Sequence, residues 1–399
     1  MSGAAARAEW RAGWPVVGGA ALGLGVALPA WNYYSSLFVV PLTQEFGWTR
    51  GELARASALS LIGAFAAPWI GKFADRLGAR PVLVFGLAAY GAVLAGFAAQ
   101  PGSLSVYAAL IVLHTGLGLA AGGAIFCRPV AGWFSVARGM ALGITMSGVP
   151  LAAAIITPAL QAVIAGAGWR GGYLFLAALA VGIGIPATLA LVRERPVATE
   201  DASSAEGGDW NAILRAPRFW LLFLSLIPVN TAGTGIMSQM APLLTDAGQS
   251  AASAALLLSI FAGAVIVARL AAGWGIDRYP PHIVAAVVTG TPALGCVVLL
   301  LGPPSFAVAA LALMLVAVQQ GAEIDLVGNL IARLFGMRHY ATAYGACVLA
   351  LGLSGAAGVL LFGQLHDWYD GYGTALWLSA LGYAAGALLL YALRLRPGE

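Results

Sequence analysis

The chain has 399 residues, of which 60% are apolar and only 9% are charged, and its formal net charge is +4. Its mean hydropathy of +0.88 excludes a water-soluble protein, because no polar surface could cover so much hydrocarbon. The basic residues are scattered between apolar runs, so they do not indicate nucleic-acid binding. Composition therefore predicts an all-α protein that crosses a lipid bilayer many times.

Apolar runs separated by Gly, Pro or charged clusters predict twelve membrane-spanning helices, each near the roughly 20 residues that a crossing requires. The runs cover approximately 14–42, 51–70, 80–99, 104–130, 138–164, 171–192, 219–244, 250–275, 282–302, 305–331, 340–364 and 371–393. One long polar segment divides them. The expected organisation is an N-terminal six-helix half at 1–192, a cytoplasmic linker at 193–217 and a C-terminal six-helix half at 218–399.

The distribution of basic residues predicts the orientation. With the N-terminus in the cytoplasm, the opposite side receives only Arg50, Arg55 and Arg170. By the positive-inside rule, both termini and the linker are then cytoplasmic. We expect a monomer that spans a bacterial inner (plasma) membrane.

A charged motif recurs at the same place in each half. The segment Gly71–Arg80, GKFADRLGAR, follows the second run, and Gly273–Arg278 repeats its spacing after the eighth. Glycine permits a tight turn with close helix contact, and an Asp at a helix end can accept hydrogen bonds from a neighbouring helix N-terminus and from Arg. We expect a latch that involves Gly71, Asp75, Arg76, Arg128, Gly273, Asp277, Arg278 and Arg333, with Arg128 and Arg333 as partners of the two acids. Ordinary loop solvation is the alternative.

This motif resembles the signature of the major facilitator superfamily, whose members have two six-helix halves around a central site. Within that superfamily, the segment Trp133–Gly148, WFSVARGMALGITMSG, is similar to the fifth-span signature of the monocarboxylate transporter family. The first motif of that family is kept only in part, as Glu9, Gly13 and Trp14. The resemblance implies alternating access driven by a gradient.

Arg269 interrupts the apolar run between Ser250 and Tyr279. An Arg near mid-span costs about 2.5 to 3.5 kcal/mol on insertion scales, so such a residue usually has a function. Its planar fork matches a carboxylate, although an interhelical ion pair is the alternative. Arg269 and Gly273 also match an Arg and Gly of the monocarboxylate transporter family, and this resemblance implies that Arg269 binds the substrate carboxylate.

Two departures from that family affect the coupling mechanism. The proton-linked Asp of animal members is Val265 here, and their first-span Lys falls near Tyr33. We therefore hypothesise that Glu323, which shares a helical face with Gln319 and Gln320, carries the proton. A structural pair between Glu323 and an arginine of the latch is the alternative.

Further polar residues lie at mid-membrane depth in spans that line the cavity in the superfamily. His114 is a candidate for proton sensing or substrate contact, with a hydrogen-bonded structural histidine as the alternative. The remaining candidate substrate contacts are Asn32, Tyr33, Tyr34, Asn230 and Gln320.

The sequence thus predicts a secondary transporter of small organic anions, with monocarboxylates as the expected substrates and proton symport as the expected coupling. A pH-independent anion exchanger and a drug or cation exporter are alternatives, as is a transport-inactive sensor or membrane enzyme. No nucleotide-binding or metal-binding motif is present, so we expect no cofactor, no metal and no catalysis.

Overall fold

The computed structural model describes residues 2–194, 213–276 and 278–394, with their side chains except those of residues 2–5, 324–325, 332 and 336–342. Among the described residues, nine helices are long and apolar enough to span a membrane, and two bent helix pairs raise the number to eleven. One of the nine, Arg138–Leu191, kinks at Gly168, whose φ of 70° interrupts the helix. Counting its two arms separately gives the twelve predicted spans and confirms the all-α membrane fold.

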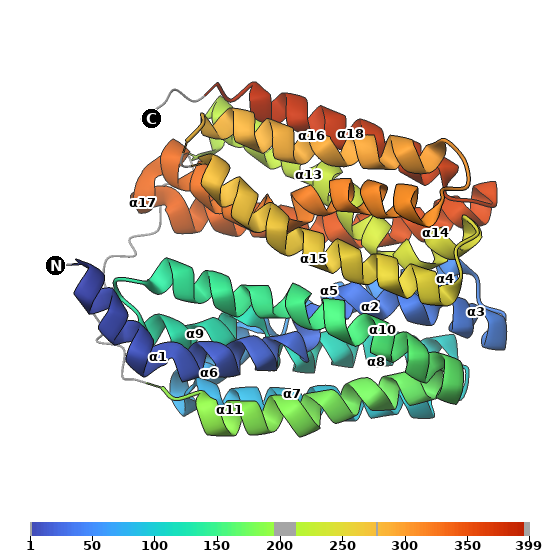
Figure 1. Cartoon of the computed structure of the whole chain (residues 1–399), viewed down its shortest axis with the longest axis horizontal. Coiled ribbons are helices and arrows are strands. Elements are labelled where there is room, and N and C mark those ends of the chain that lie inside the picture. Colours follow the sequence, from blue (N-terminus) through green and yellow to red (C-terminus); the bar gives the residue numbers. More distant parts are fainter. Residues whose placement is uncertain (1, 195–212, 277, 395–399) are drawn as a thin grey trace. The chain divides into compact units, whose positions relative to one another are not determined.

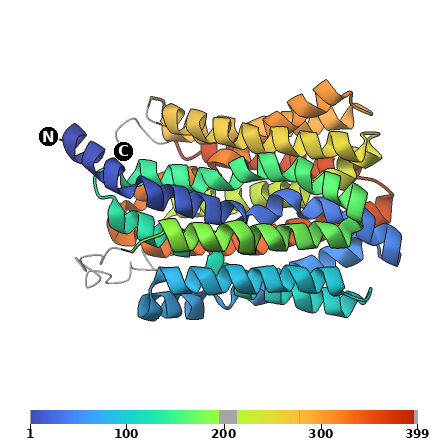
Figure 2. The same cartoon turned by 60° about the horizontal axis from the view of Figure 1, so that its bottom comes forward.

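The first structural unit comprises Met1–Trp48 and Leu59–Ala198. Its long helices run side by side in one general direction (Figure 1, Figure 2). Its elements are α1 (Ser2–Gly25), η1 (Leu28–Ala30), α2 (Trp31–Tyr34), η2 (Ser35–Phe38), α3 (Val39–Phe46), α5 (Ser60–Ala64), α6 (Ala67–Leu77), α7 (Ala79–Ala99), α8 (Leu104–Gly118), η3 (Leu119–Ala121), α9 (Gly123–Trp133), α10 (Arg138–Leu179), the π-helical η4 (Ala180–Gly184) and α11 (Ile185–Leu191).

Proline marks the breaks in these helices. Pro29 lies in η1, where the first span bends by 52°, and Pro68 lies just after the 44° bend of the second span. Pro186 follows the π-helical turn η4. Proline has no backbone N–H and its ring clashes with the preceding turn, which favours an interruption just before it. Proline does not always break a helix here, because α10 continues through Pro150 and Pro158.

The second unit comprises Thr49–Ala58 and Thr199–Glu399. Its helices are α4 (Arg50–Ala58), α13 (Pro217–Ser238), α14 (Met240–Asp246), α15 (Ala251–Ile276), α16 (Pro281–Leu300), α17 (Phe306–Tyr369) and α18 (Gly373–Tyr391). The helix α4 belongs by sequence to the predicted N-terminal half, yet it packs with the second unit. Most of the predicted linker, residues 195–212, lies outside the described residues.

Side chains on the outer faces of these helices are strongly apolar. Ile155 and Leu174 of unit 1 are 67% and 52% exposed, and Leu294 and Leu388 of unit 2 are 62% and 70% exposed. Large apolar side chains with this exposure suit contact with lipid, where helices satisfy their own backbone hydrogen bonds. The structure thus presents a membrane-facing surface, with polar side chains gathered inside each unit.

Candidate functional site

Arg269 lies on α15 where this helix closely approaches α17 at Gly321. Its Nε donates a hydrogen bond to the carbonyl oxygen of Gly321 at 3.0 Å, and the side chain is half-buried. A Cβ at Gly321 would lie 2.4 Å from the carbonyl oxygen of Val265, so only glycine permits this approach. The bond from Nε holds one edge of the guanidinium against α17 and so restricts its orientation.

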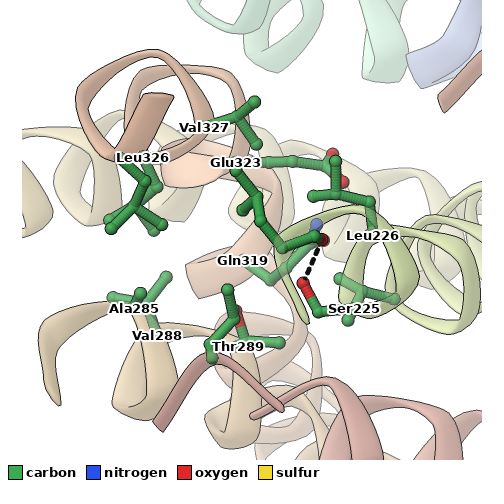
Figure 3. A pocket seen from close by; sticks show the side chains of 13 residues that line it. Ser225, Leu226, Ala285, Val288, Thr289, Gln319, Glu323, Leu326 and Val327 are labelled. Atoms are coloured by element: carbon green, nitrogen blue, oxygen red, sulfur yellow. Dashed lines mark hydrogen bonds between the residues drawn. The ribbon is translucent and has the colours of Figure 1, made fainter. Parts of the chain in front are cut away.

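Glu323 and Gln319 form a second polar site, inside unit 2 (Figure 3). Both side chains line the same pocket as Ser225 of α13 and Thr289 of α16, and Figure 3 labels all four. They line a cavity of about 20 Å³, which is room for about one water molecule. Glu323 is 9% exposed, and among the described residues its Oε1 and both amide atoms of Gln319 have no hydrogen-bond partner. Buried polar atoms are normally paired, so the unpaired oxygen of Glu323 requires an explanation.

The two sites lie on different faces of one helix. Residues in an α-helix are separated by about 100° of rotation, so Glu323 points about 200° away from Gly321. Gly321 faces Arg269 on α15, whereas Glu323 faces the interior formed by α13 and α16. The structure thus connects the arginine and the acid through two residues of α17 without bringing them into one pocket.

Asn230 on α13 uses its side-chain amide within unit 2. Its Nδ2 donates to the carbonyl oxygen of Leu351 at 2.6 Å and to Oγ of Ser354 at 3.0 Å, both on α17. These bonds use both hydrogens of the amide, so only its oxygen could accept from a substrate. Gln320, which is half-buried, lies near Gly233 of the same helix α13. The substrate roles of Asn230 and Gln320 stay predictions.

The candidates of the first span separate into two environments. Tyr34 is 1% exposed and its hydroxyl lies 3.5 Å from the carbonyl oxygen of Gly25, whereas Asn32 is exposed and Tyr33 is half-buried. The neighbouring tyrosines differ in burial because successive helical residues point in different directions. Their individual roles stay predictions.

His114 on α8 is enclosed by aromatic rings of unit 1. It is 1% exposed, and its ring centroid lies 4.8 Å from that of Trp31, 5.0 Å from that of Tyr90 and 5.9 Å from that of Phe97. Its Nε2 has no hydrogen-bond partner among the described residues. This environment gives the ring little access to water, and the role of His114 stays a prediction.

The first copy of the charged motif contains the expected ion pair. Arg128 Nη1 donates to Asp75 Oδ1 at 2.7 Å, which confirms the contact and leaves its gating role a prediction. Gly71 lies within α6 rather than in a turn, and a Cβ there would meet no heavy atom of the described residues within 4 Å. The expectation of a turn with close helix contact at Gly71 was therefore wrong. The turn falls at Gly78, where φ is 86°, and Arg76 is exposed.

The second copy of the motif is described only in part. Asp277 lies outside the described residues, so its pairing with Arg333 stays a prediction. Arg333 Nε donates to Oδ1 of Asn329 at 3.0 Å, and the guanidinium carbon of Arg278 lies 4.4 Å from the ring centroid of Trp274. Gly273 lies within α15, and a Cβ there would meet no heavy atom of the described residues within 4 Å, so its role stays a prediction.

The sequence did not reveal that the two family-like motifs of unit 1 touch. One carboxylate oxygen of Glu9 accepts hydrogen bonds from the backbone N–H and the Oγ of Ser135, at 3.1 and 2.6 Å, and the other accepts from the N–H of Ala137 at 3.0 Å. A Cβ at Gly13 would lie 2.6 Å from the ring of Phe134. The signal was present in the motif residues, but their contact depends on tertiary structure.

Many apolar helices with a few polar side chains inside the helical units are typical of a membrane transporter. The family model of the Major Facilitator Superfamily matches residues 20–358. The chain therefore belongs to the Major Facilitator Superfamily. The crystal structure of the nucleoside transporter NupG shares the fold, with a TM-score of 0.75 and 16% identity over 95% of this chain and 98% of that chain.

Two relatives extend the similarity to the family that the motifs suggested. Monocarboxylate transporter 13 of Rattus norvegicus is 29% identical over 356 residues, which cover 85% of this chain and 78% of the relative. The oxalate:formate antiporter of Oxalobacter formigenes is 28% identical over 338 residues, which cover 79% and 76% of the two chains. The predicted resemblance to monocarboxylate transporters is thus confirmed, and these relatives are transporters rather than enzymes.

Proposed function

We propose that the chain transports small organic anions, with monocarboxylates as its substrates, and that Arg269 binds the substrate carboxylate. The observation that carries this proposal is the bond from Arg269 Nε to the carbonyl oxygen of Gly321, because it orients a guanidinium inside a membrane-spanning helix. A planar guanidinium pairs with a carboxylate through two parallel hydrogen bonds. The names of the monocarboxylate and oxalate:formate relatives support an anionic substrate.

Proton symport is the coupling that we propose, with Glu323 as the proton carrier. A carboxyl in a dry site is more stable when it is neutral, and the cavity beside Glu323 has room for a water molecule that could pass on a proton. Because Glu323 and the contact of Arg269 lie two residues apart on α17, a small rotation of this helix would move both. Proton release and anion release would then occur in one conformational step.

Anion exchange is the second candidate, and the similarity to an oxalate:formate antiporter favours it. In an exchanger, the empty carrier cannot return across the membrane until a second anion binds to the arginine. Such a mechanism requires no titrating acid. The two mechanisms differ in one measurable respect: a symporter accumulates its substrate in response to a pH difference alone, whereas an exchanger needs a substrate on both sides.

The cellular setting is also part of the proposal. We propose a multi-pass protein of a bacterial inner membrane, with both termini in the cytoplasm, that works as a monomer. The asymmetric distribution of basic residues supports this orientation. The alternating-access mechanism needs no partner beyond the lipid bilayer, the anion and the proton.

The test is uptake of a panel of labelled aliphatic and aromatic carboxylates into proteoliposomes, with and without an imposed pH difference. We expect Arg269→Ala to lower uptake of the preferred substrate by about 100-fold, and Arg269→Lys to retain a small fraction because it keeps the charge but not the fork. Arg55→Ala, which removes an exposed cation from α4, is the matched control. Undiminished uptake by a folded Arg269→Ala protein would exclude the anion site.

A further inference from the structure

The interior of unit 2 contains polar atoms that no hydrogen bond satisfies. The hydroxyl of Tyr383 on α18 has no hydrogen-bond partner among the described residues, although this residue is 0% exposed. Both amide atoms of Gln319 and Oε1 of Glu323 are in the same situation, and these two residues are 2% and 9% exposed. Buried polar atoms without partners are rare, because they lose hydration without gaining a bond. Their number in one helical unit therefore requires an explanation.

The three side chains lie close together. A Cβ built on Gly233 of α13 would lie 3.3 Å from Oε1 of Gln319 and 3.3 Å from the hydroxyl oxygen of Tyr383, so both oxygens border the same small space. Gln319 and Glu323 lie one helical turn apart on α17 and line one pocket (Figure 3), and they interact although their atoms lack the geometry of a hydrogen bond. Tyr383 is also close enough to Glu323 for an electrostatic interaction. Small rotations of these side chains can therefore pair them.

The unpaired atoms complement one another as donors and acceptors. The hydroxyl of Tyr383 can donate to Oε1 of Gln319, and Nε2 of Gln319 can donate to Oε1 of Glu323. These two hydrogen bonds would use all four unpaired atoms. An ionised carboxyl gains most from them, because a hydrogen bond to a charged group is about twice as strong as one between neutral groups. A protonated carboxyl carries its own hydrogen and has less need of the donors.

Little else near Glu323 is available to stabilise a negative charge. Among the described residues that line its pocket there is no arginine, lysine or histidine, and α18 lines the pocket itself with an apolar side chain. From α13, the hydroxyl of Ser225 already donates to a backbone carbonyl oxygen at 2.6 Å, and α16 contributes Thr289 to the pocket and the thiol of Cys296 near the α18 hydroxyl. From α15, Arg269 approaches another face of α17. The amide and the hydroxyl described above are therefore the donors suited to this charge.

We propose that Gln319 and Tyr383 are positioning residues for the proton of Glu323, and that they close a hydrogen-bonded chain onto its carboxylate when the proton leaves. The proton passes from the carboxyl to a water molecule, while Tyr383 and Gln319 keep their own hydrogens and only donate hydrogen bonds. The chain therefore helps to set the pH at which Glu323 releases its proton. Because Tyr383 comes from α18, it also couples the charge of Glu323 to the packing of α18 against α17. This inference rests on the proposed proton role of Glu323.

The test follows the carboxyl directly, by infrared difference spectroscopy of the purified full-length protein during a pH titration without substrate. The carbonyl band of a protonated carboxyl disappears when the proton leaves, and loss of the band in Glu323→Gln assigns it to Glu323. We expect Tyr383→Phe, which keeps the ring and removes the hydroxyl, to move the midpoint upward by about one pH unit, a tenfold change in the proton equilibrium. Gln319→Met, which keeps the length of the side chain and removes the amide, should move the midpoint at least as far.

Tyr173→Phe is the matched control, because Tyr173 is also 0% exposed but belongs to unit 1. We expect its midpoint to equal that of the parent. An unchanged midpoint in Tyr383→Phe, or an equal shift in Tyr173→Phe, would overturn the chain and leave the proton role of Glu323 intact. If Tyr383→Phe does not fold, the midpoint of Gln319→Met decides in the same way. A titrating band that persists in Glu323→Gln would instead overturn the proton role itself, and the chain with it.

Discussion

The two membrane-spanning parts of α17, Phe306–Glu323 and Ala343–Tyr369, carry polar groups in different states. At the end of the first part, Glu323 and Gln319 are buried with polar atoms that have no partner among the described residues. At the end of the second part, Asp367 caps Gly51, and its neighbour His366 lies close to an Asp246 that Arg50 engages with two hydrogen bonds. The carboxylates of this second cluster are paired, although Nδ1 of His366 has no hydrogen-bond partner among the described residues.

The difference indicates what each cluster can do. A bidentate ion pair favours one geometry, so it is suited to holding two elements together. A buried carboxyl with an oxygen that lacks a partner is costly as an anion, and a proton or a water molecule lowers that cost. We therefore propose exchange of protons at Glu323 and attachment of α4 at the C-terminal end of α17, and three changes test that contrast.

The largest effect is expected at Glu323 of α17. Glu323→Gln should abolish accumulation driven by a pH difference, a loss of about 10-fold or more, while counterflow of labelled against unlabelled substrate continues, because the amide cannot release a proton. The measurement is uptake into proteoliposomes, driven in one assay by a pH difference and in the other by unlabelled substrate on the opposite side. Asp370→Asn, which neutralises an exposed acid in the cavity lined by Arg50 and Asp246, is the control. Continued pH-driven accumulation by Glu323→Gln would exclude Glu323 as the proton carrier.

An intermediate effect is expected where α15 meets α17. Gly321→Ala would place a Cβ 2.4 Å from the carbonyl oxygen of Val265, so the helices must separate and the bond from Arg269 must lengthen. Overpacking of this kind costs about 1 to 3 kcal/mol of unfolding free energy and should also weaken substrate binding. Gly263→Ala on α15, where a Cβ meets no heavy atom of the described residues within 4 Å, is the control. Thermal unfolding in detergent and the KM for uptake are measured together, and equal behaviour of the two variants would contradict the close contact.

The smallest effect is expected at the C-terminal end of α17, and it depends on pH. Burial would raise the pKa of Asp246, but the hydrogen bonds and charge of Arg50 outweigh it and hold this pKa below its ordinary value. A lowered folded pKa means that the ion pair stabilises the protein above the ordinary aspartate pKa of about 3.9 and that this contribution is lost as pH falls through the lower folded value. Asp246→Asn should therefore lower the free energy of unfolding by about 1 kcal/mol at neutral pH. The variant should then lose less further stability than the parent as the pH falls.

The matched control for this last change is again Asp370→Asn, because that exposed acid lies in the same cavity and asparagine tolerates its left-handed backbone conformation, with φ of 51°. Thermal unfolding is followed from neutral pH down to about pH 3. If the unfolding temperature falls equally steeply with decreasing pH in Asp246→Asn and in the parent, the pair contributes nothing to the stability of unit 2.

Much of the architecture could be predicted from local sequence. Apolar run lengths gave the twelve spans, because a bilayer requires a helix of nearly fixed length whatever its neighbours are. The Asp75 motif and its spacing to Arg128 gave a correct ion pair. Arg269 could be identified from the cost of placing a guanidinium within an apolar span. Its bond to the carbonyl oxygen of Gly321 could not be predicted, because it depends on how two helices pack.

The errors and omissions have a common physical cause. Gly71 was placed in a turn, but the chain continues as helix to Leu77 and turns at Gly78, where a positive φ is required. Adjacent Tyr33 and Tyr34 differ in burial because helical neighbours point about 100° apart. Arg50 was counted only as a topology signal, since its partners Asp246 and Tyr372 lie hundreds of residues away in the chain.

The sequence by itself determined that this protein is a many-helix membrane carrier with one charged residue of special interest in its eighth span, because hydrophobic length and the cost of a buried charge are properties of single segments. The tertiary structure alone decided which polar groups are satisfied. It leaves Glu323 without a described partner for Oε1 and gives Arg50 several, because hydrogen bonds between separate helices depend on packing that no local pattern encodes.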